Sequence, residues 1–524
     1  MAEKNYNHIP KEKFSFVNEG ERLSDQKFED KPIGYFKDAW IRFRKSKASV
    51  AATILICLII AYAFLAPVLI TNHESTFMVN MYSKKPGRIA ALYNLGGMFD
   101  GGLERDFSEK GLVKAVGIGV GAENWDGTPV SVGESLDSEY QPMIKIGEPK
   151  TVIGAGKKES LSFKGRIDSY LEVGFFYRSI KQSELQDILD WEAETGKKVL
   201  YPLIEDNEWN MDVNDPNYWF KSKKGSPVSV DASGNAKILA YGEDLVLEDN
   251  YKRDADGNLV YYEYTGGGTL ETAQLKVRVL YYNYYQYLYG NTPDYILGTD
   301  SQGYDMALRL AGGIKLSLLV AVFVCVINFI LGSIYGAIEG YYGGTVDIVL
   351  ERVSDILVNV PFIVVATLFQ IHLSKKLGPV PCLLFAYVVT GWISTASRVR
   401  TQFYRFKTQE YVMAARTLGA RDSRIIWKHI FPNSLGTIIT SSALAIPSTM
   451  LSESNLSFLG IVKLGTAEAT SLGTLLADAQ GIWTNYPHLM IYPAIVISLL
   501  MICFNLFGNG LRDAFNPALR GVEE

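Results

Sequence analysis

Apolar and polar residues are segregated into long blocks along this chain. Six runs of 19 to 23 residues contain no Asp, Glu, Lys or Arg, and they cover residues 48–70, 316–338, 356–374, 377–396, 433–452 and 487–508. About 20 apolar residues, at a rise of 1.5 Å each, cross a hydrocarbon core about 30 Å thick as a helix that satisfies its own backbone hydrogen bonds. The pattern therefore predicts a polytopic α-helical membrane protein with six transmembrane helices.

The 235 residues between the first two runs, 71–305, follow a different pattern and predict a mixed α/β domain. Strand-like runs at 236–241, 258–264 and 275–289 are separated by turn sequences such as DASGN, DADGN and TGGG. The stretch SELQDILDWEAETG is predicted to be a helix, which Ser183 and Gln186 open as a capping box and Gly196 closes.

Two short stretches of this domain have alternative interpretations. The run from Asp254 to Asn258 resembles part of a calcium loop, but its glycine comes two positions too early and no Glu occupies the twelfth position, so a hairpin turn is favoured. The tyrosine-rich run from Tyr281 to Tyr289 is interpreted as a half-buried strand, because paired aromatic residues stabilise sheets. A ligand-binding or membrane-interface role for these tyrosines is the alternative.

The distribution of charge predicts the orientation of the chain. Residues 71–305 contain 36 acidic and 24 basic residues, a net charge of -12, whereas the rest of the chain is positive, since the whole chain has a net charge of -5. Basic residues precede the first span at 42–47 and follow the fourth span at 398–428, and Lys and Arg near span ends are retained in the cytoplasm. Both termini are therefore predicted to be cytoplasmic and residues 71–305 extracellular. Only Lys375 and Lys376 depart from the rule.

The N-terminal 47 residues are predicted to form a cytoplasmic segment. About 45 polar residues precede the first apolar run, which is too long for the core of a signal peptide. Residues 33–47 mix aromatic and basic positions, which suits a helix that lies along the inner leaflet. A plain extension of the first span is an equally good interpretation. The four cysteines all lie in predicted spans, so the extracellular domain has no disulfide framework.

Sequence motifs for catalysis and for cofactor binding are missing. The chain contains no GxxxxGK[ST] nucleotide-binding loop, and its five histidines do not stand at metal-ligand spacing with Cys or carboxylates. A proton or ion relay would require acids or bases inside the membrane, and the six predicted spans contain no Asp, Glu, Lys or Arg. We therefore expect a non-catalytic transport subunit without its own cofactor or metal, whose energy comes from another protein.

The cytoplasmic loop after the fourth span is the most informative segment. Residues 410–418 are good helix formers, Gly419 can adopt φ > 0 to end that helix, and Asp422 or Ser423 can cap a second helix that runs toward Pro432. Two short helices with an apolar face and a basic rim would fit a groove of a soluble partner. Two interfacial helices on the lipid surface are the alternative.

This loop resembles the cytoplasmic coupling loop of ABC-importer permeases, whose pattern is Glu-Ala-Ala, three residues, Gly, about ten residues, an apolar residue and Pro. Met413 departs from the pattern, because it stands where the family has Glu. The resemblance implies that the ATPase-coupling residues are Glu410, Ala414, Ala415, Arg416, Gly419, Ala420, Ile430 and Pro432.

Three further motifs resemble the C-type subunit of the oligopeptide and dipeptide permeases. They are LGTDSQGYD before the second span, ESNLSFLG after the fifth and FNLFGNGLRDAFNP at the end of the sixth. In the first motif Tyr304 replaces the usual Arg, and Gly313 and Lys315 stand where Ala and Arg are frequent. The motif residues are Gly298, Thr299, Asp300, Gly303, Asp305, Glu453, Ser457, Phe458, Leu459, Gly460, Gly510, Leu511, Arg512 and Asp513.

The resemblance implies the type I ABC-importer permease fold, with an extracellular α/β insertion at about 80–290 where relatives have a short loop. The implied partners are a second, B-type permease subunit, two cytoplasmic ATPases that bind ATP and Mg, an extracellular peptide-binding lipoprotein, a peptide cargo and the lipid bilayer, with no nucleic acid. The implied layout is a cytoplasmic segment 1–47, a first span 48–70, an extracellular segment 71–305, a permease core 306–510 with the coupling loop 397–432, and a cytoplasmic tail 511–524.

Two other functions fit parts of the sequence. An ion-coupled secondary transporter would need intramembrane acids and an inverted repeat, and a membrane-anchored receptor or adhesin would leave the coupling loop without a role. The acidic insertion is expected to dock a binding protein, with bracing of the partner permease as the alternative.

Pro361, Pro447 and Pro493 mark either bends in moving helices or simple packing kinks. Neither the cargo nor the residues of the substrate path can be named from the sequence.

Overall fold

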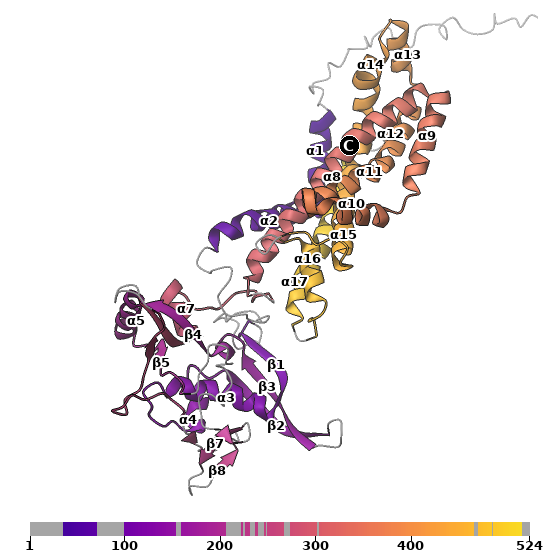
Figure 1. Ribbon diagram of the computed structural model, residues 1–524. Coiled ribbons are helices and arrows are strands. Elements are labelled where there is room, and N and C mark those ends of the chain that lie inside the picture. Colours follow the sequence, from indigo (N-terminus) through magenta and orange to yellow (C-terminus); the bar gives the residue numbers. More distant parts are fainter. Residues whose placement is uncertain are drawn as a thin grey trace, which may run out of the picture.

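The computed structural model describes residues 35–70, 99–153, 159–205, 249–266, 273–300, 303–465, 470–484 and 486–515, with short strands between residues 222 and 247. Two regions are distinguished here. The helical region comprises residues 35–70 and 306–515, and the α/β region comprises residues 99–305. The helical region and the α/β region lie at opposite ends of the molecule (Figure 1). The DASGN turn and the end of the 236–241 run lie outside the described residues.

The helical region contains five helical segments that are long and apolar enough to cross a membrane: Lys47–Leu69, Met306–Tyr342, Pro379–Phe406, Asp422–Phe458 and His488–Phe515. Its elements are α1 (Tyr35–Lys45), α2 (Lys47–Leu69), α8 (Met306–Tyr342), α9 (Gly344–Val358), α10 (Phe362–Leu377), α11 (Pro379–Gly391), α12 (Ile393–Phe406), α13 (Glu410–Thr417), α14 (Asp422–Arg424), a π-helix η3 (Ile425–Ile430), α15 (Phe431–Phe458), α16 (Leu472–Ala479) and α17 (His488–Phe515).

The third predicted span is not one straight helix. Residues 356–374 straddle the break between α9 and α10, which are bent by 69° relative to each other and count as a sixth span only if they are taken together. Pro361 lies at this break as the N-cap of α10, with ψ 122. The helix breaks here because proline lacks an N–H for a helical hydrogen bond and disfavours the helical conformation of the residue before it. Pro447 and Pro493 lie inside the continuous helices α15 and α17.

The helices α8 and α12 pack with their backbones in close contact. A Cβ atom added at Gly336 would overlap the carbonyl oxygen of Ala396, and one at Gly340 would lie 2.8 Å from the carbonyl oxygen of Arg400. Gly332 meets α12 in the same way one turn earlier. Small residues at i, i+4 and i+8 bring membrane helices together because close van der Waals packing replaces the hydrophobic effect that lipid does not supply.

The helix α1 is separate from the first span. Ser46 interrupts the two helices and caps α2, where its hydroxyl accepts a hydrogen bond from the backbone N–H of Ser49 at 3.4 Å. Ala39 and Phe43 are buried with Ala514 of α17, whereas Trp40 is 58% exposed. The structure therefore contradicts a plain extension of the first span.

The α/β region contains three antiparallel sheets. Its elements are β1 (Gly102–Ser108), α3 (Glu109–Glu123), α4 (Val132–Leu136), β2 (Met143–Ile153), β3 (Glu159–Asp168), a 3-10 turn η2 (Leu171–Val173), β4 (Phe175–Lys181), α5 (Gln182–Thr195), β5 (Leu200–Tyr201), β6 (Ser222–Lys223), β7 (Ser226–Val230), β8 (Ala236–Ile238), β9 (Val246–Leu247), β10 (Tyr262–Tyr264), β11 (Gln274–Leu280) and α7 (Tyr281–Tyr289). The sheet orders are β1-β3-β2, β10-β11-β4 with β5 on β11, and β6-β7-β8 with β9 on β7.

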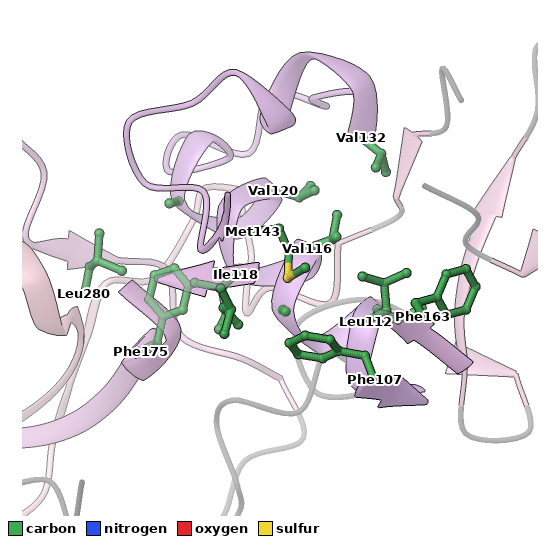
Figure 2. Packing of buried hydrophobic residues seen from close by; sticks show 14 of the residues in the cluster. Phe107, Leu112, Val116, Ile118, Val120, Val132, Met143, Phe163, Phe175 and Leu280 are labelled. Atoms are coloured by element: carbon green, nitrogen blue, oxygen red, sulfur yellow. The ribbon is translucent and has the colours of Figure 1, made fainter. Parts of the chain in front are cut away.

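Two hydrophobic clusters fill this region. One packs α3 against the first sheet, and Figure 2 shows Phe107, Val116, Met143 and Phe163 of this cluster. The other joins the second sheet to α5 and α7. The described residues of this segment therefore combine helices with antiparallel sheets.

The prediction of a strand through Tyr289 is wrong. Strand β11 ends at Leu280, and Tyr281–Tyr289 forms the helix α7. Tyrosines at positions 281, 285 and 289 follow the four-residue spacing of one helix face, and the ring centroids of Tyr285 and Tyr289 lie 4.7 Å apart. The rings of Tyr284 and Tyr285 are completely buried, so tertiary packing overrides the strand preference of tyrosine.

The predicted ends of the helix at 183–196 are half right. Gly196 closes α5 in the left-handed conformation, with φ 72, as predicted. The N-cap is Lys181 without a side-chain hydrogen bond, so the capping box of Ser183 and Gln186 is wrong. A full capping box occurs instead at Ser131 and Glu134 of α4.

The hairpin turn at DADGN is confirmed. The Asp254 carboxylate accepts hydrogen bonds from the backbone N–H groups of Asp256 and Asn258, and Gly257 adopts φ 86. A bridge between Arg253 and Leu259 closes the turn.

Candidate functional site

The coupling-loop helix ends as the sequence predicts. Gly419 has φ 79, the N–H of Ala420 donates to the carbonyl of Ala415 at 3.0 Å, and the N–H of Gly419 donates to that of Arg416 at 3.0 Å. This pair of bonds is the Schellman arrangement, which places glycine in the left-handed conformation just after the helix. A Cβ atom added at Gly419 would meet no other atom within 4 Å, so its backbone conformation rather than lack of space requires glycine.

The helix α13 has one anchored face and one exposed face. Val412 is buried with Ile425 and Ile430 in a cluster that includes residues of α8 and α12. Met413 is 57% exposed and Leu418 is 88% exposed. Ala414 is exposed, and Ala415 and Ala420 are half-buried. An exposed apolar surface on a fixed base can bind a partner with little loss of conformational entropy.

Polar contacts tie this loop to the end of α8. The Tyr341 hydroxyl donates to the carboxylate of Asp422 at 2.5 Å, and Arg416 donates to the Tyr341 hydroxyl oxygen at 3.3 Å. Sequence reasoning missed Tyr341, because it precedes Arg416 by 75 residues and belongs to no motif.

The predicted second helix of the loop is present and runs toward Pro432, but its predicted cap is wrong. Arg421 occupies the N-cap without a side-chain hydrogen bond, so neither Asp422 nor Ser423 caps the helix. From Arg424 the helix continues as the π-helix Ile425–Ile430 and then as α15, so it passes Pro432 without ending there. Pro432 lies in the first turn of α15, where proline is tolerated, so the fifth span begins earlier than the predicted residue 433.

A charged cluster beside the loop joins α8, α9 and α12. The guanidinium of Arg400 lies 2.6 Å from Asp347, 2.9 Å from Glu351 and 3.5 Å from Glu339. Sequence reasoning counted Arg400 only as a topology signal, because its partners precede it by about 50 residues. Buried ion pairs need several partners to offset desolvation, and this arginine has three.

Lys407 extends the charged cluster toward α13. Its ammonium group donates to the carbonyl of Gly340 at 3.0 Å and lies 4.0 Å from the ring centroid of Tyr404. Burial lowers the pKa of Lys407, and the nearby Asp347 opposes that shift.

The first family motif forms a folded turn at the start of α8. Asp305 caps the helix by accepting from the N–H of Ala307 at 2.7 Å, and Thr299 pairs with Asp305 in an antiparallel bridge. Asp300 forms a buried ion pair with Arg309 at 3.0 Å. Gly298 and Gly303 adopt φ 75 and 86, which the turn requires.

The three departures from the family pattern in this motif are accommodated locally. Tyr304, in place of Arg, lies with its ring centroid 5.1 Å from the guanidinium of Arg309. A Cβ atom added at Gly313 would lie 3.3 Å from Leu472, and Lys315 lies above the ring of Phe64.

The second family motif contains a buried carboxylate. Glu453 is 1% exposed and accepts hydrogen bonds from the hydroxyls of Ser317 at 3.0 Å, Ser457 at 3.0 Å and Ser471 at 2.7 Å. The prediction that no acid lies within a span is wrong, because the membrane-length segment Asp422–Phe458 contains Glu453. The sequence ESNLS, with serine one helical turn after the glutamate, carries part of this signal.

The remaining residues of this motif end the helix. Gly460 adopts φ 72, and its N–H donates to the carbonyl of Ser457 at 2.9 Å. Phe458 is half-buried and Leu459 is 64% exposed.

The third family motif lies at the end of α17. Gly510 packs so closely on Ser49 of α2 that a Cβ atom would overlap its side chain. Leu511 packs with α1, whereas Arg512 and Asp513 are exposed. The motif therefore joins the first and last spans.

A cavity of about 890 Å³ lies between α8, α11, α12, α15 and α17. Hydroxyl groups of α15, among them Thr437, Thr440, Ser441 and Ser448, line much of it. Its lining includes Arg512, together with Arg398 and Arg405 from the segment 397–432, but none of the eight residues named above as ATPase-coupling. Among the described residues, no group of three or more His, Cys, Asp or Glu could hold a metal ion.

Comparisons with known proteins agree with the motifs. The family model described as the binding-protein-dependent transport system inner membrane component matches residues 328–521. The model described as the N-terminal TM domain of oligopeptide transport permease C matches residues 34–86.

Curated relatives are peptide permeases. The chain is 39% identical over 228 residues to the oligopeptide transport system permease protein OppC of Bacillus subtilis (strain 168), an alignment that covers 43% of this chain and 73% of that protein. It is 37% identical over 233 residues to the dipeptide transport system permease protein DppC of the same organism, with 43% and 70% coverage.

Among solved structures, the inward-facing MetNI methionine ABC transporter aligns with 15% identity, 40% coverage of this chain, 98% coverage of that chain and a TM-score of 0.34. The apolar helices and the family matches show a multi-pass protein of the plasma membrane. The chain belongs to the binding-protein-dependent inner membrane components, as a C-type permease subunit of the oligopeptide and dipeptide ABC transporters.

Proposed function

We propose that this chain forms half of the translocation path of an ATP-driven peptide importer and couples that path to cytoplasmic ATPases through α13. Two relatives named above are oligopeptide and dipeptide permeases, which supports a peptide cargo. The chain itself contributes no cofactor-binding or catalytic residue, and ATP and Mg are bound by the partner ATPases.

The exposed face of α13 carries this proposal. Leu418 and Met413 present apolar side chains to solvent on a helix whose opposite face is buried against α8 and α12. A soluble partner that grips this face moves the buried base with it, so closure of an ATPase dimer changes how the spans pack. Such a change is a two-state element whose equilibrium the partner biases.

The hydroxyl-lined cavity supports the path. Its uncharged serine and threonine side chains can exchange hydrogen bonds with a peptide backbone whatever the side chains of the cargo. Half of a path is expected from one subunit, and the B-type permease supplies the other half.

The proposed topology has six spans, with α9 and α10 as one bent span. Both termini are cytoplasmic, and residues 71–305 are extracellular with their net charge of -12. Tyr486, between α16 and α17, packs against the hydrophobic cores of both regions. The α/β region is therefore held at the extracellular mouth, where it docks the peptide-binding lipoprotein.

The topology is tested with a thiol reagent that does not cross membranes. Ser138→Cys in the α/β region should react in intact cells, and Ser423→Cys beside α13 should react only after permeabilisation. The native cysteines are first replaced by Ala or Ser. Labelling of Ser423→Cys in intact cells contradicts the topology.

Coupling is tested by changing the exposed apolar face. In the assembled transporter, Leu418→Asp should abolish copurification of the ATPases and reduce peptide uptake at least tenfold, because an aspartate cannot fill an apolar groove. Leu189→Asp is the matched control, since Leu189 is a 43% exposed leucine on α5 of the α/β region. Normal uptake by Leu418→Asp contradicts the proposal.

Buried Glu453 favours one alternative, an ion-coupled transporter. Three serine hydroxyls already donate hydrogen bonds to this carboxylate, which supports a structural role in holding neighbouring helices together instead. Uptake that follows a proton gradient and persists after ATP depletion would establish the alternative.

A further inference from the structure

We infer that the cavity between α8, α12, α15 and α17 sorts cargo by charge, because Arg398, Arg405 and Arg512 favour cargo that carries carboxylates over cationic cargo. This inference rests on the proposed function, since it assigns a substrate preference to the proposed path.

The charge of the lining is one-sided. The residues that line the cavity include three arginines and no Asp, Glu, Lys or His. The other polar groups are hydroxyls, amides and one thiol, such as Ser394, Thr440 and Asn505. Neutral hydroxyls and amides bind donors and acceptors alike, so the arginines are the groups of the lining that distinguish an anionic from a cationic cargo.

These three arginines differ from their neighbour Arg400. Arg400 is engaged by Asp347 and Glu351 on the side of α12 that faces α9. Arg398 and Arg405 stand seven residues apart on α12, which is two helical turns, so both fall on one face of the helix about 10 Å apart. No ion pair joins Arg398, Arg405 or Arg512 to a carboxylate in the described part of the chain, and all three are exposed.

Arginine suits the recognition of a carboxylate. Its planar guanidinium binds a carboxylate through two parallel hydrogen bonds and stays charged at any physiological pH. Arg512 lines the same cavity from the last turn of α17. A carboxylate that passes this part of the path therefore meets cations from two helices, and an ammonium group meets repulsion there.

Positive charge at these positions also has a simpler explanation. Arg405 and Arg512 lie in the last turns of their helices, where cations complement the helix dipole and mark the cytoplasmic side. That explanation predicts no discrimination among cargoes. The helix dipole, in addition, does not account for Arg398, which lies mid-helix and lines the same cavity.

The test measures uptake of two peptides, Gly-Glu-Gly and Gly-Lys-Gly, by the complete transporter in proteoliposomes. The quantity compared is the ratio of the two uptake rates in each variant divided by the same ratio in the wild type. This double ratio cancels the preference of the binding protein, which is identical in all preparations.

We expect each of Arg398→Gln, Arg405→Gln and Arg512→Gln to lower the ratio of Gly-Glu-Gly to Gly-Lys-Gly uptake about two- to fivefold, the effect of a partly screened charge contact. The discrimination should shrink as salt rises, because the Debye length falls to about 3 Å at 1 M. Arg352→Gln is the matched control, since Arg352 lies on α9 outside the cavity and is 71% exposed.

The outcomes separate the inference from the proposed function. A double ratio of one in all three variants, with both peptides slowed equally, overturns charge sorting and leaves the importer intact. A wild-type transporter that takes up neither peptide overturns the proposed function instead. A change in Arg352→Gln equal to that in the cavity variants attributes the effect to general surface charge and also overturns the inference.

Discussion

The helical region and the α/β region hold themselves together in opposite ways. Nine of the ten largest fully buried side chains in the described residues belong to the α/β region, and Phe403 is the exception. They include Arg278, which is buried with its guanidinium 4.2 Å from the ring centroid of Phe175. The helical region instead brings backbones together at glycines such as Gly336 and Gly510.

This difference reflects the two solvents. In water, burial of large apolar and aromatic side chains stabilises a domain in proportion to the area removed from water. In lipid the hydrophobic effect does not drive helices together, so close van der Waals packing and hydrogen bonds between helices stabilise the helical region instead. The two regions should therefore be sensitive to different substitutions. Enlarging a glycine at a helix contact destabilises the helical region, and truncating a buried large side chain destabilises the α/β region.

The largest expected effect is in the glycine contact of the helical region. Gly336→Leu should separate α8 from α12 and lower the free energy of unfolding by about 3 kcal/mol or more, so that little folded protein accumulates in the membrane. The measurement is the yield of monodisperse complex in detergent. Gly312→Leu is the matched change in the same helix, where no atom lies within 4 Å of the new Cβ. Equal yields from both variants would disprove the close-contact argument.

Truncation of a buried side chain should damage the α/β region next most strongly. Ile188 on α5 is completely buried, so Ile188→Ala should cost about 2–5 kcal/mol. Hydrogen exchange read by mass spectrometry should show faster exchange in β4, β11 and α5, while α8 and α15 stay protected. Leu189→Ala, at a 43% exposed neighbour, should change little. Faster exchange throughout the helical region would show that the two regions unfold together.

The buried carboxylate of Glu453 should give an intermediate effect. Glu453→Gln replaces one acceptor oxygen by an N–H₂ group that faces a hydroxyl donor, which should lower stability by about 1–3 kcal/mol. Ser457→Ala removes a single donor and leaves two, so its effect should be smaller. Thermal unfolding of the purified complex measures both. Greater stability of Glu453→Gln would show that burial of the charge outweighs its three hydrogen bonds.

The smallest expected effects concern helix caps, one in each region. Ser131→Ala removes a capping box in the α/β region and should cost about 1 kcal/mol. Ser46→Ala removes the cap of α2, whose hydrogen bond is longer at 3.4 Å, and should cost less. Thermal unfolding of the two variants in parallel gives the comparison. The reverse order would mean that Ser46 holds α1 and α2 together through more than its cap.

Local signals predicted the features that depend on neighbouring residues. Uncharged runs located the membrane helices, and Gly419 and Gly196 were predicted as helix ends because a left-handed residue is required within the segment itself. The turn at Asp254 was predicted for the same reason.

Features that depend on distant residues could not be predicted. Glu453 depends on Ser317, 136 residues earlier, and Arg400 depends on Asp347 in another helix. The residues of α7 have both strand and helix preferences, and only burial between the sheet and Tyr295 decides between them. The cavity requires helices from four parts of the chain, so no single stretch of sequence indicates it.

The length of α8 has a mechanical consequence. Its 37 residues extend about 55 Å, from the Asp305 cap beside the α/β region to Tyr341, which contacts Asp422 below α13. Because α8 and α12 touch backbone to backbone, α8 cannot slide past α12 without losing that fit. The two helices therefore move as one unit, and under the proposed function a tilt that the ATPases impose at the Tyr341 end would also shift the α/β region at the Asp305 end.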